Sequence, residues 1–151
     1  MAANQNGETG AAVVAAARLW LGTPYLHQAS CRGVGVDCLG LIRGIWRDLY
    51  GGEPERMPNY SADWAEAQGL ETLRDAAARW MSPVAPEAAA PGDILLFRWR
   101  AHLPAKHVAV LSDKVRFIHA CEGIPVSEVA LSGWWRRRIA YVFRFPPLKK
   151  D

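Results

Sequence analysis

Hydrophobic and polar positions follow a helical period in the first half of the chain. After Cys38, apolar residues recur every three or four positions, and they are Leu41, Ile42, Ile45 and Leu49. The alanine-rich segment 11–21 also has a helical pattern, and Gly51-Gly52 marks the end of the central one. A third helical pattern runs from Trp64 to Trp80, where Gly69 can split it. The first half is therefore predicted to be helical.

The period changes after the proline- and alanine-rich segment 83–92. Four short segments that follow are rich in β-branched and aromatic residues: DILLFRW (93–99), HVAVLS (107–112), VRFIHA (115–120) and IAYVFRF (139–145). Helices followed by strands are typical of an α+β domain. We therefore predict N-terminal helices packed on a C-terminal antiparallel sheet.

The length and composition indicate one globular domain. The chain has 151 residues, of which 50% are hydrophobic, and its net charge of +3 is too small to indicate nucleic-acid binding. We predict a flexible N-terminus at 1–10, a single domain at 11–146 and a C-terminal tail at 147–151. The first ten residues lack the basic and apolar regions of a secretory signal, and no apolar stretch is long enough to span a bilayer.

A cysteine lies where the central helical pattern begins. The three cysteines, Cys31, Cys38 and Cys121, cannot all pair within the chain, so at least one thiol is free. Asp37 is a natural N-cap, and the unpaired N–H groups of a helix N-terminus favour a thiolate. We therefore expect Cys38 to have a depressed pKa and to be alkylated fast well below about pH 8. The alternative is an inert thiol packed in the core.

A cysteine nucleophile needs a histidine base, which a third group must orient. The candidates are His27, His102, His107 and His119. The last two begin and end one predicted hairpin. A three-residue loop at 112–114 would place them directly opposite each other on one face, with Cβ atoms about 5 Å apart. A two-residue loop would place them on opposite faces.

Four motifs together resemble the NlpC family of cysteine peptidases, papain-related enzymes that cut bacterial cell-wall peptides. They are GTPY (22–25), DCLGL (37–41, usually DCSGL in the family), PGD with the apolar strand after it (91–97), and the pair HV and HA at 107 and 119. The match runs in the family's order from about residue 11 to residue 145. GTPYLHQAS and the closing RRRIAYVFRFP are most similar to the subgroup carried by tailed phages and phage-like gene transfer agents.

The resemblance implies a papain-like fold and a peptidoglycan endopeptidase that cleaves stem peptides between D-Glu and the diamino acid. Cys38 would be the nucleophile, His107 the general base and then acid, and His119 the residue that orients the imidazole. The Tyr25 hydroxyl would lie near the oxyanion or the substrate, and Asp37 would face the substrate's free amino group. The alternatives are that Tyr25 only packs, that Asp37 only caps the helix, and that His119 is structural.

Two positions depart from the family pattern. Leu39 replaces the usual serine, which removes a polar contact from the substrate pocket. His27 and Gln28 stand where many members have Trp-Gly or Gly-Gly. Both changes bear on the bond that is cut and on the end group of the substrate, not on the nucleophile.

The resemblance implies no cofactor. A zinc site built from His27, Cys31, His119 and Cys121 is a weak alternative, because paired C-x-x-C units are missing. The expected partners are the stem peptide and tail-tip or baseplate proteins, with no direct nucleic-acid contact and no membrane span. We expect a protein made in the cytoplasm without a signal peptide, carried on a phage-like tail as a virion component, and acting in the target cell's periplasm or wall.

Other functions remain open from the sequence. An amidase or acyltransferase could use the same nucleophile and fold, and the chain could be a catalytically silent structural protein of a tail. The segment 136–138, three arginines, fits a solvated face, with contact to an anionic wall or partner as the alternative. The Trp134-Trp135 pair fits either a corner of the core or an exposed docking patch.

Overall fold

The computed structural model describes residues 2–55 and 71–149, and it confirms the predicted α+β class. The helices are α1 (Ala2–Arg18), α2 (Cys38–Tyr50), α4 (Thr72–Trp80) and α5 (Gly133–Arg136), with a short 3-10 helix η1 (Pro86–Ala88). The strands are β1 (Ser30–Cys31), β2 (Gly35–Val36), β3 (Ser82–Val84), β4 (Ile94–Phe97), β5 (His107–Asp113), β6 (Arg116–Cys121), β7 (Ile124–Ala130) and β8 (Ile139–Arg144).

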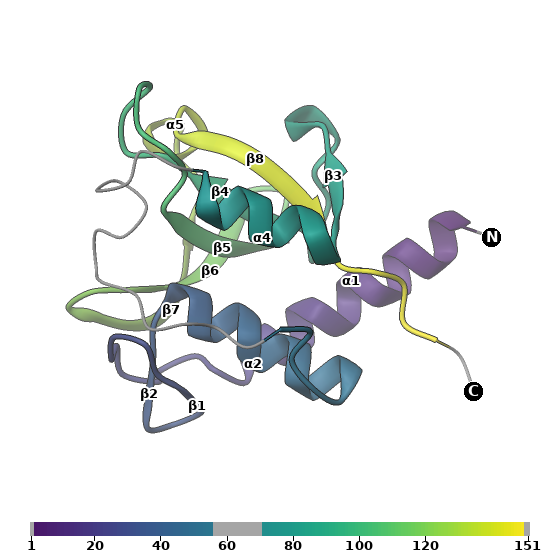
Figure 1. Cartoon of the computed structure of the whole chain (residues 1–151), viewed down its shortest axis with the longest axis horizontal. Helices are drawn as coiled ribbons and strands as arrows, with labels where there is room; N and C mark the ends of the chain where they lie inside the picture. Colours follow the sequence, from purple (N-terminus) through teal and green to yellow (C-terminus); the bar gives the residue numbers. More distant parts are fainter. Residues whose placement is uncertain (1, 56–70, 150–151) are drawn as a thin grey trace.

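In the described part of the chain, six strands form one antiparallel sheet in the order β3-β8-β4-β5-β6-β7, and β1 and β2 form a small separate hairpin. Helices α1 and α2 lie along one side of the sheet, and α4 crosses in front of it (Figure 1). The sheet follows the helices along the sequence, as predicted from the change in period.

The sheet is buried on both faces, and each face has its own apolar core. Along β4, Ile94 and Leu96 point to the core shared with α1, α2 and α4, whereas Leu95 and Phe97 point to the opposite core. Alternate residues of a strand face opposite sides, so a strand buried on both sides is apolar throughout. This explains the unbroken ILLF sequence, in which all four residues are buried.

The sequence did not predict the two edge strands, β3 and β7. Each contains a proline, Pro83 in β3 and Pro125 in β7, and proline lacks the N–H that a central strand must donate. Both strands lie at the ends of the sheet order, where one side of the strand needs no partner. The proline signal that argues against a central strand is therefore compatible with an edge strand.

The helix boundaries differ from the prediction at the N-terminus. Helix α1 begins at Ala2, so residues 2–10, predicted as a flexible terminus, are helical. Thr9 is buried and its hydroxyl accepts a hydrogen bond from the backbone N–H of Leu148, which fastens this segment to the C-terminal part of the chain. Helix α2 ends as predicted, with Gly51 in the left-handed conformation.

The third predicted helix is described only in part. Helix α4 covers the end of that pattern, and its Leu73 and Ala77 are buried against the sheet. Trp64 and Gly69 lie outside the described residues.

The PGD motif fastens the start of β4 to β8. The Asp93 carboxylate is buried, accepts a hydrogen bond from the Ala90 N–H, and forms a bidentate ion pair with Arg144 at 2.8 Å. Gly92 lies against Gly10 of α1 so closely that a side chain at either position would overlap the other segment. The motif is thus a junction between the first helix and the sheet.

The β5–β6 hairpin has a different register from the predicted one. Its turn has two residues, and Asp113 pairs with Arg116. Ser112 is then an extra residue on β5, because Leu111 pairs with Phe117. This bulge restores the side-chain alternation that a two-residue turn alone would have reversed.

Gly40 lies where α2 meets the loop before β1. A Cβ at this position would overlap the backbone carbonyl oxygen of Ala29. We expect Gly40→Ala to lower the free energy of unfolding by about 1–3 kcal/mol, because backbone must move to admit the methyl group. Urea unfolding of the variant measures this. Gly52→Ala is the control, since a Cβ there has no atom within 4 Å; equal effects of the two substitutions would contradict the expectation.

Candidate active site

Cys38 is the first residue of α2, and Asp37 caps this helix as predicted. One Asp37 carboxylate oxygen accepts the Gly40 N–H and the other accepts the Gln28 N–H, both at 2.7 Å. The Asp37 residue is only 2% exposed. Its two oxygens therefore join the preceding loop to the helix start, and its contact with a substrate amino group stays a prediction.

The Cys38 thiol lies against β5. The backbone N–H groups of Val108 and Leu39 lie within hydrogen-bonding reach of the sulfur, which places it beside the strand position that follows His107. The helix start therefore brings the predicted nucleophile to the strand that carries the predicted base.

The prediction that Cys38 has a depressed pKa was wrong. Burial raises the pKa of the thiol to about 12, and the negative charge of Asp37 raises it further. The Val108 and Leu39 N–H groups act in the opposite direction but are outweighed. The sequence pointed to the favourable helix N-terminus, but it did not show how much water the fold removes from the sulfur.

This correction changes the expected alkylation profile. Since the thiol pKa is raised, the thiolate fraction at neutral pH is small and grows as the pH approaches 12. We expect the rate of Cys38 alkylation by iodoacetamide to rise steadily from about pH 7 to about pH 10, because the thiolate is the reactive form. Mass spectrometry of the labelled peptide measures the rate. A plateau reached well below pH 8 would contradict this and restore a thiolate in the resting protein.

The two predicted histidines meet on one face of the sheet. Nε2 of His107 and Nδ1 of His119 lie 2.8 Å apart, and both residues are buried. The register makes them diagonal neighbours rather than directly opposite residues, because Val110 pairs with Ile118. The hairpin does not have the predicted three-residue loop. The bulge at Ser112 nevertheless places both histidines on the same face of the sheet, as predicted.

Both imidazoles are neutral at neutral pH. Burial lowers the pKa of His107 to about 3, and the neighbouring His119 lowers it further. Burial also lowers the pKa of His119 to about 4. A neutral imidazole has one ring nitrogen free to accept a proton, so the pair can act as a base.

Tyr25 lies near the start of α2. Tyr25 is half-buried and forms an isolated bridge with Val36, the residue before Asp37. Burial raises the Tyr25 pKa to about 12, and negative charge at Cys38 and Asp37 raises it further. The hydroxyl therefore stays protonated at neutral pH and can donate a hydrogen bond.

Comparison with known proteins gives the family. The model of the NlpC/P60 family matches residues 22–143, most of the chain. This chain belongs to the NlpC/P60 family.

Relatives and solved structures agree with this assignment. The chain is 26% identical over 139 residues to the Gamma-DL-glutamyl hydrolase of Bacillus subtilis (strain 168), covering 90% of this chain but only 29% of that protein. The NlpC/p60 domain of peptidoglycan hydrolase SagA superposes with a TM-score of 0.61 at 21% identity, covering 89% of this chain and 97% of that one. An NlpC/P60 protein of Bacillus cereus ATCC 10987 gives a TM-score of 0.65 at 20% identity, covering 91% and 40%. These structures show the NlpC/P60 papain-like fold predicted from the motifs.

Tryptophan side chains that sequence reasoning left unassigned enclose the histidine pair of this NlpC/P60 domain. The Trp135 ring lies 6.0 Å from the His107 ring and 5.4 Å from the His119 ring, centroid to centroid. The Trp99 ring stacks on His107 at 5.5 Å. Trp135 is thus partly buried against the core on this face of the sheet, whereas Trp134 is 46% exposed. The adjacent tryptophans were the signal available in the sequence, and the turn that partly buries Trp135 was not visible there.

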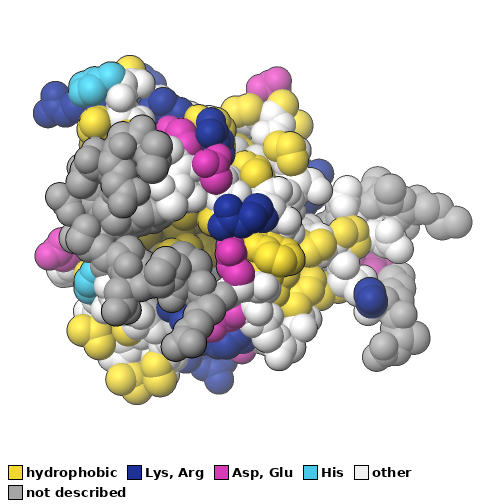
Figure 2. Space-filling model, in the orientation of Figure 1, with side chains coloured by type: hydrophobic (Ala, Val, Ile, Leu, Met, Phe, Trp, Pro, Cys, Tyr) yellow, Lys and Arg dark blue, Asp and Glu magenta, His cyan; other side chains and the backbone are white. Residues whose placement is uncertain are grey.

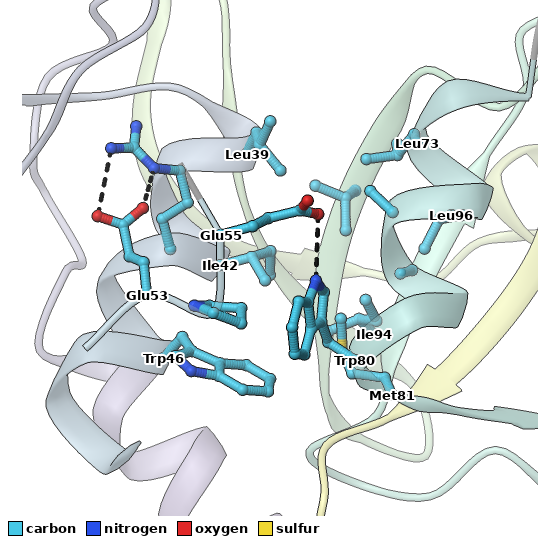
Figure 3. Close-up of a pocket in the computed structure, with 15 residues that line it drawn as sticks. Leu39, Ile42, Trp46, Glu53, Glu55, Leu73, Trp80, Met81, Ile94 and Leu96 are labelled. Atoms are coloured by element: carbon cyan, nitrogen blue, oxygen red, sulfur yellow. Dashed lines mark hydrogen bonds and ion pairs between the residues drawn. The ribbon is translucent and has the colours of Figure 1, made fainter. Parts of the chain in front are cut away.

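An apolar pocket lies between α2, α4 and the sheet (Figure 3). Leu39 and Val108 form its end nearest the site, and Trp46 and Trp80 form its far part. In this domain the position that is usually serine in the family thus contributes to an apolar wall. On the face shown in Figure 2, hydrophobic side chains gather at the middle beside paired basic and acidic groups.

The described residues contain no group of three or more His, Cys, Asp or Glu side chains that could hold a metal ion. Within residues 2–55 and 71–149, no helix is both long and apolar enough to cross a membrane.

Proposed function

We propose that this NlpC/P60 domain is a cysteine peptidase that cleaves peptidoglycan stem peptides with Cys38, His107 and His119. The observation that supports this best is the 2.8 Å contact between His107 of β5 and His119 of β6, together with the Cys38 thiol beside Val108 of β5. Acyl transfer requires a nucleophile, a base close to it and a group that orients the base, and these three residues supply one candidate for each role.

The neutral resting state defines the first step. His107 donates its Nε2–H to Nδ1 of His119, which leaves the His107 Nδ1 lone pair for the thiol. As the Cys38 sulfur attacks the amide carbonyl, its proton moves to this nitrogen. The reaction thus forms the thiolate only during attack, in agreement with the raised thiol pKa and lowered imidazole pKa.

The remaining steps use the same groups. The Cys38 backbone N–H and the Tyr25 hydroxyl donate to the oxyanion of the tetrahedral intermediate. The His107 imidazolium then protonates the leaving amine as the carbon–nitrogen bond breaks, giving a thioester on Cys38. Water attacks the thioester with His107 as base, which releases the carboxylic acid and restores the thiol. Asp37 supports this chemistry by holding the helix start, and its contact with a free amino group is part of the proposal.

The proposed scissile bond joins D-Glu to the diamino acid of the stem peptide. The motif resemblance supports this choice, and so does the similarity to a protein named for γ-glutamyl hydrolysis. The chain spans less than a third of that relative, so the comparison supports the chemistry of the domain rather than the activity of the whole protein.

Digestion of purified peptidoglycan followed by mass spectrometry tests the proposal. The expected products end in a free γ-carboxyl of D-Glu on one side and a free α-amino group of the diamino acid on the other. Fragments cut between the sugar and L-Ala would indicate an amidase, and fragments joined to an added amine would indicate an acyltransferase. Either result would contradict the endopeptidase.

We also propose that the protein is carried on a phage-like tail and opens the wall locally in the target cell. The similarity of GTPYLHQAS and RRRIAYVFRFP to the tail-associated subgroup supports this role. Immunogold labelling of purified particles tests it, with label expected at the tail tip or baseplate. Absence of the protein from purified particles would contradict it.

A further inference from the structure

A cationic pocket lies at the end of the sheet where β4 ends and β8 begins. The residues that line it, called the basic pocket from here on, are Arg98, Trp99, Arg100, Ala101, Arg137 and Arg138. The backbone N–H of Arg98 donates to the Arg138 carbonyl oxygen at 2.9 Å, so the two segments are held together. The hollow measures about 570 Å³, a size typical of ligand clefts. Figure 1 shows the connection after β4 running beside α5, and basic side chains gather at the same corner in Figure 2.

The positive charge of the basic pocket is not neutralised within the described residues. No carboxylate is among the lining residues, and the ion pairs in the described part of the chain use side chains outside the pocket. The pocket therefore places four guanidinium groups around one hollow without a counter-charge. Like charges that are brought together repel each other, so a bound anion relieves such a site.

Two of these arginines are held in fixed positions. The Arg138 guanidinium lies 3.7 Å from the Trp134 ring centroid and donates to the Trp134 carbonyl oxygen. Arg98 donates to the Ala101 carbonyl oxygen, and its guanidinium lies 5.4 Å from the Tyr141 ring centroid. A guanidinium that is already ordered loses less side-chain entropy when it binds. The pocket is therefore prepared for an anion before the anion arrives.

The aromatic rings at the basic pocket are engaged within the protein. The Trp134 ring carries the Arg138 guanidinium and meets the Trp135 ring edge-on at 4.9 Å. The Trp99 ring stacks on His107 at 5.5 Å. Single-stranded nucleic acid binds through a cationic groove together with ring faces on which its bases stack. Since these rings already have partners, the basic pocket fits a phosphate chain without bases better than it fits a nucleic acid.

We propose that the basic pocket binds the phosphodiester groups of a polyol-phosphate polymer in the cell wall. Guanidinium groups bind phosphate oxygens through paired, charge-assisted hydrogen bonds, which makes arginine the fitting residue for them. Four guanidiniums around one hollow suit a chain of repeated negative charges better than a single charge. The choice of a wall polymer rests on the proposed function, whereas the binding itself requires no cleavage. Bound polymer holds the domain against the wall that contains its stem peptides.

Isothermal titration calorimetry of the full chain with poly(glycerol phosphate) tests this proposal, at low ionic strength where charge attraction is least screened. The variant Arg100→Gln, Arg137→Gln removes two guanidiniums of the pocket; both residues are exposed, so the fold is spared. We expect this variant to bind about tenfold or more weakly than the wild type, because charge-assisted hydrogen bonds are lost. The control variant Arg18→Gln, Arg32→Gln removes the same charge from two exposed arginines outside the pocket and should bind as the wild type does.

Absence of binding by the wild type, or an equal loss in the pocket variant and the control, overturns the proposal. Poly-glutamate that binds as tightly as poly(glycerol phosphate) indicates a site for any polyanion and also overturns it. Single-stranded DNA with the same number of phosphates overturns it too, if it binds at least as tightly and loses its affinity in the pocket variant. Poly(glycerol phosphate) carries no peptide bond, so these results are separate from peptidoglycan digestion. A wild type that binds the polymer but releases no stem-peptide fragments contradicts the proposed function alone.

Discussion

Replacing Cys38 by alanine is expected to reduce the rate of stem-peptide cleavage by about 1,000-fold or more. The substitution removes the sulfur that forms the thioester in the proposed mechanism, and hydrogen-bond donors alone recover a small part of the rate. The measurement is kcat/KM on a defined stem peptide, with products identified by mass spectrometry. Circular dichroism confirms that the fold is retained.

The chain offers matched controls for this substitution. Cys31 is exposed and Cys121 is partly buried, and neither starts a helix against β5. Cys31→Ala and Cys121→Ala are expected to change kcat/KM less than about twofold. If Cys38→Ala kept wild-type activity, the enzyme proposal would fall and a silent structural role in a tail would gain support.

Replacing His107 by alanine is expected to reduce kcat by about 100- to 10,000-fold, the range of a lost general base. Added imidazole should restore part of the rate, because the substitution leaves a space among the Phe97, Trp99 and Trp135 rings. The exposed His102 is the control, and His102→Ala should leave kcat unchanged. An active His107→Ala protein without imidazole would remove His107 from the mechanism.

In the proposed mechanism His119 acts through His107, so its substitution should separate orientation from proton transfer. His119→Asn keeps an oxygen that can accept the His107 Nε2–H and should retain more activity than His119→Ala. A positioning role also predicts that His119→Ala changes the pH dependence of kcat, since the preferred tautomer of His107 is no longer fixed. Equal activity and equal pH profiles of the two variants would make His119 merely structural.

The parts of the fold that the sequence predicted are those in which the hydrophobic period is strong. The central helix was predicted from Cys38 to Gly51 because apolar residues recur along one face and Asp37 and Gly51 mark its ends. The four inner strands were predicted because they are rich in β-branched and aromatic residues, and β4, which is buried on both faces, is apolar throughout. The edge strands were missed because proline and exposed polar residues weaken the strand pattern.

The sequence named the residues of the candidate site, whose roles stay predictions, but it did not indicate their electrostatics. Cys38, His107 and Tyr25 each lie in a short sequence motif, so they could be named from the sequence alone. The pKa of the thiol depends on how Val108, Leu39 and the surrounding apolar side chains exclude water, which only the folded chain defines. The stacking of Trp99 and Trp135 on the imidazoles likewise joins segments that are distant in sequence.

The extra residue at Ser112 has a consequence for how this hairpin tolerates changes in length. If one residue is removed or added there, the side chains of β5 that precede it change faces relative to β6. His107 and His119 then lie on opposite sides of the sheet. Removing or adding two keeps them on the same side. Viable insertions and deletions in this hairpin are therefore expected in even numbers, a rule that a deletion-scanning library selected for wall digestion would reveal directly.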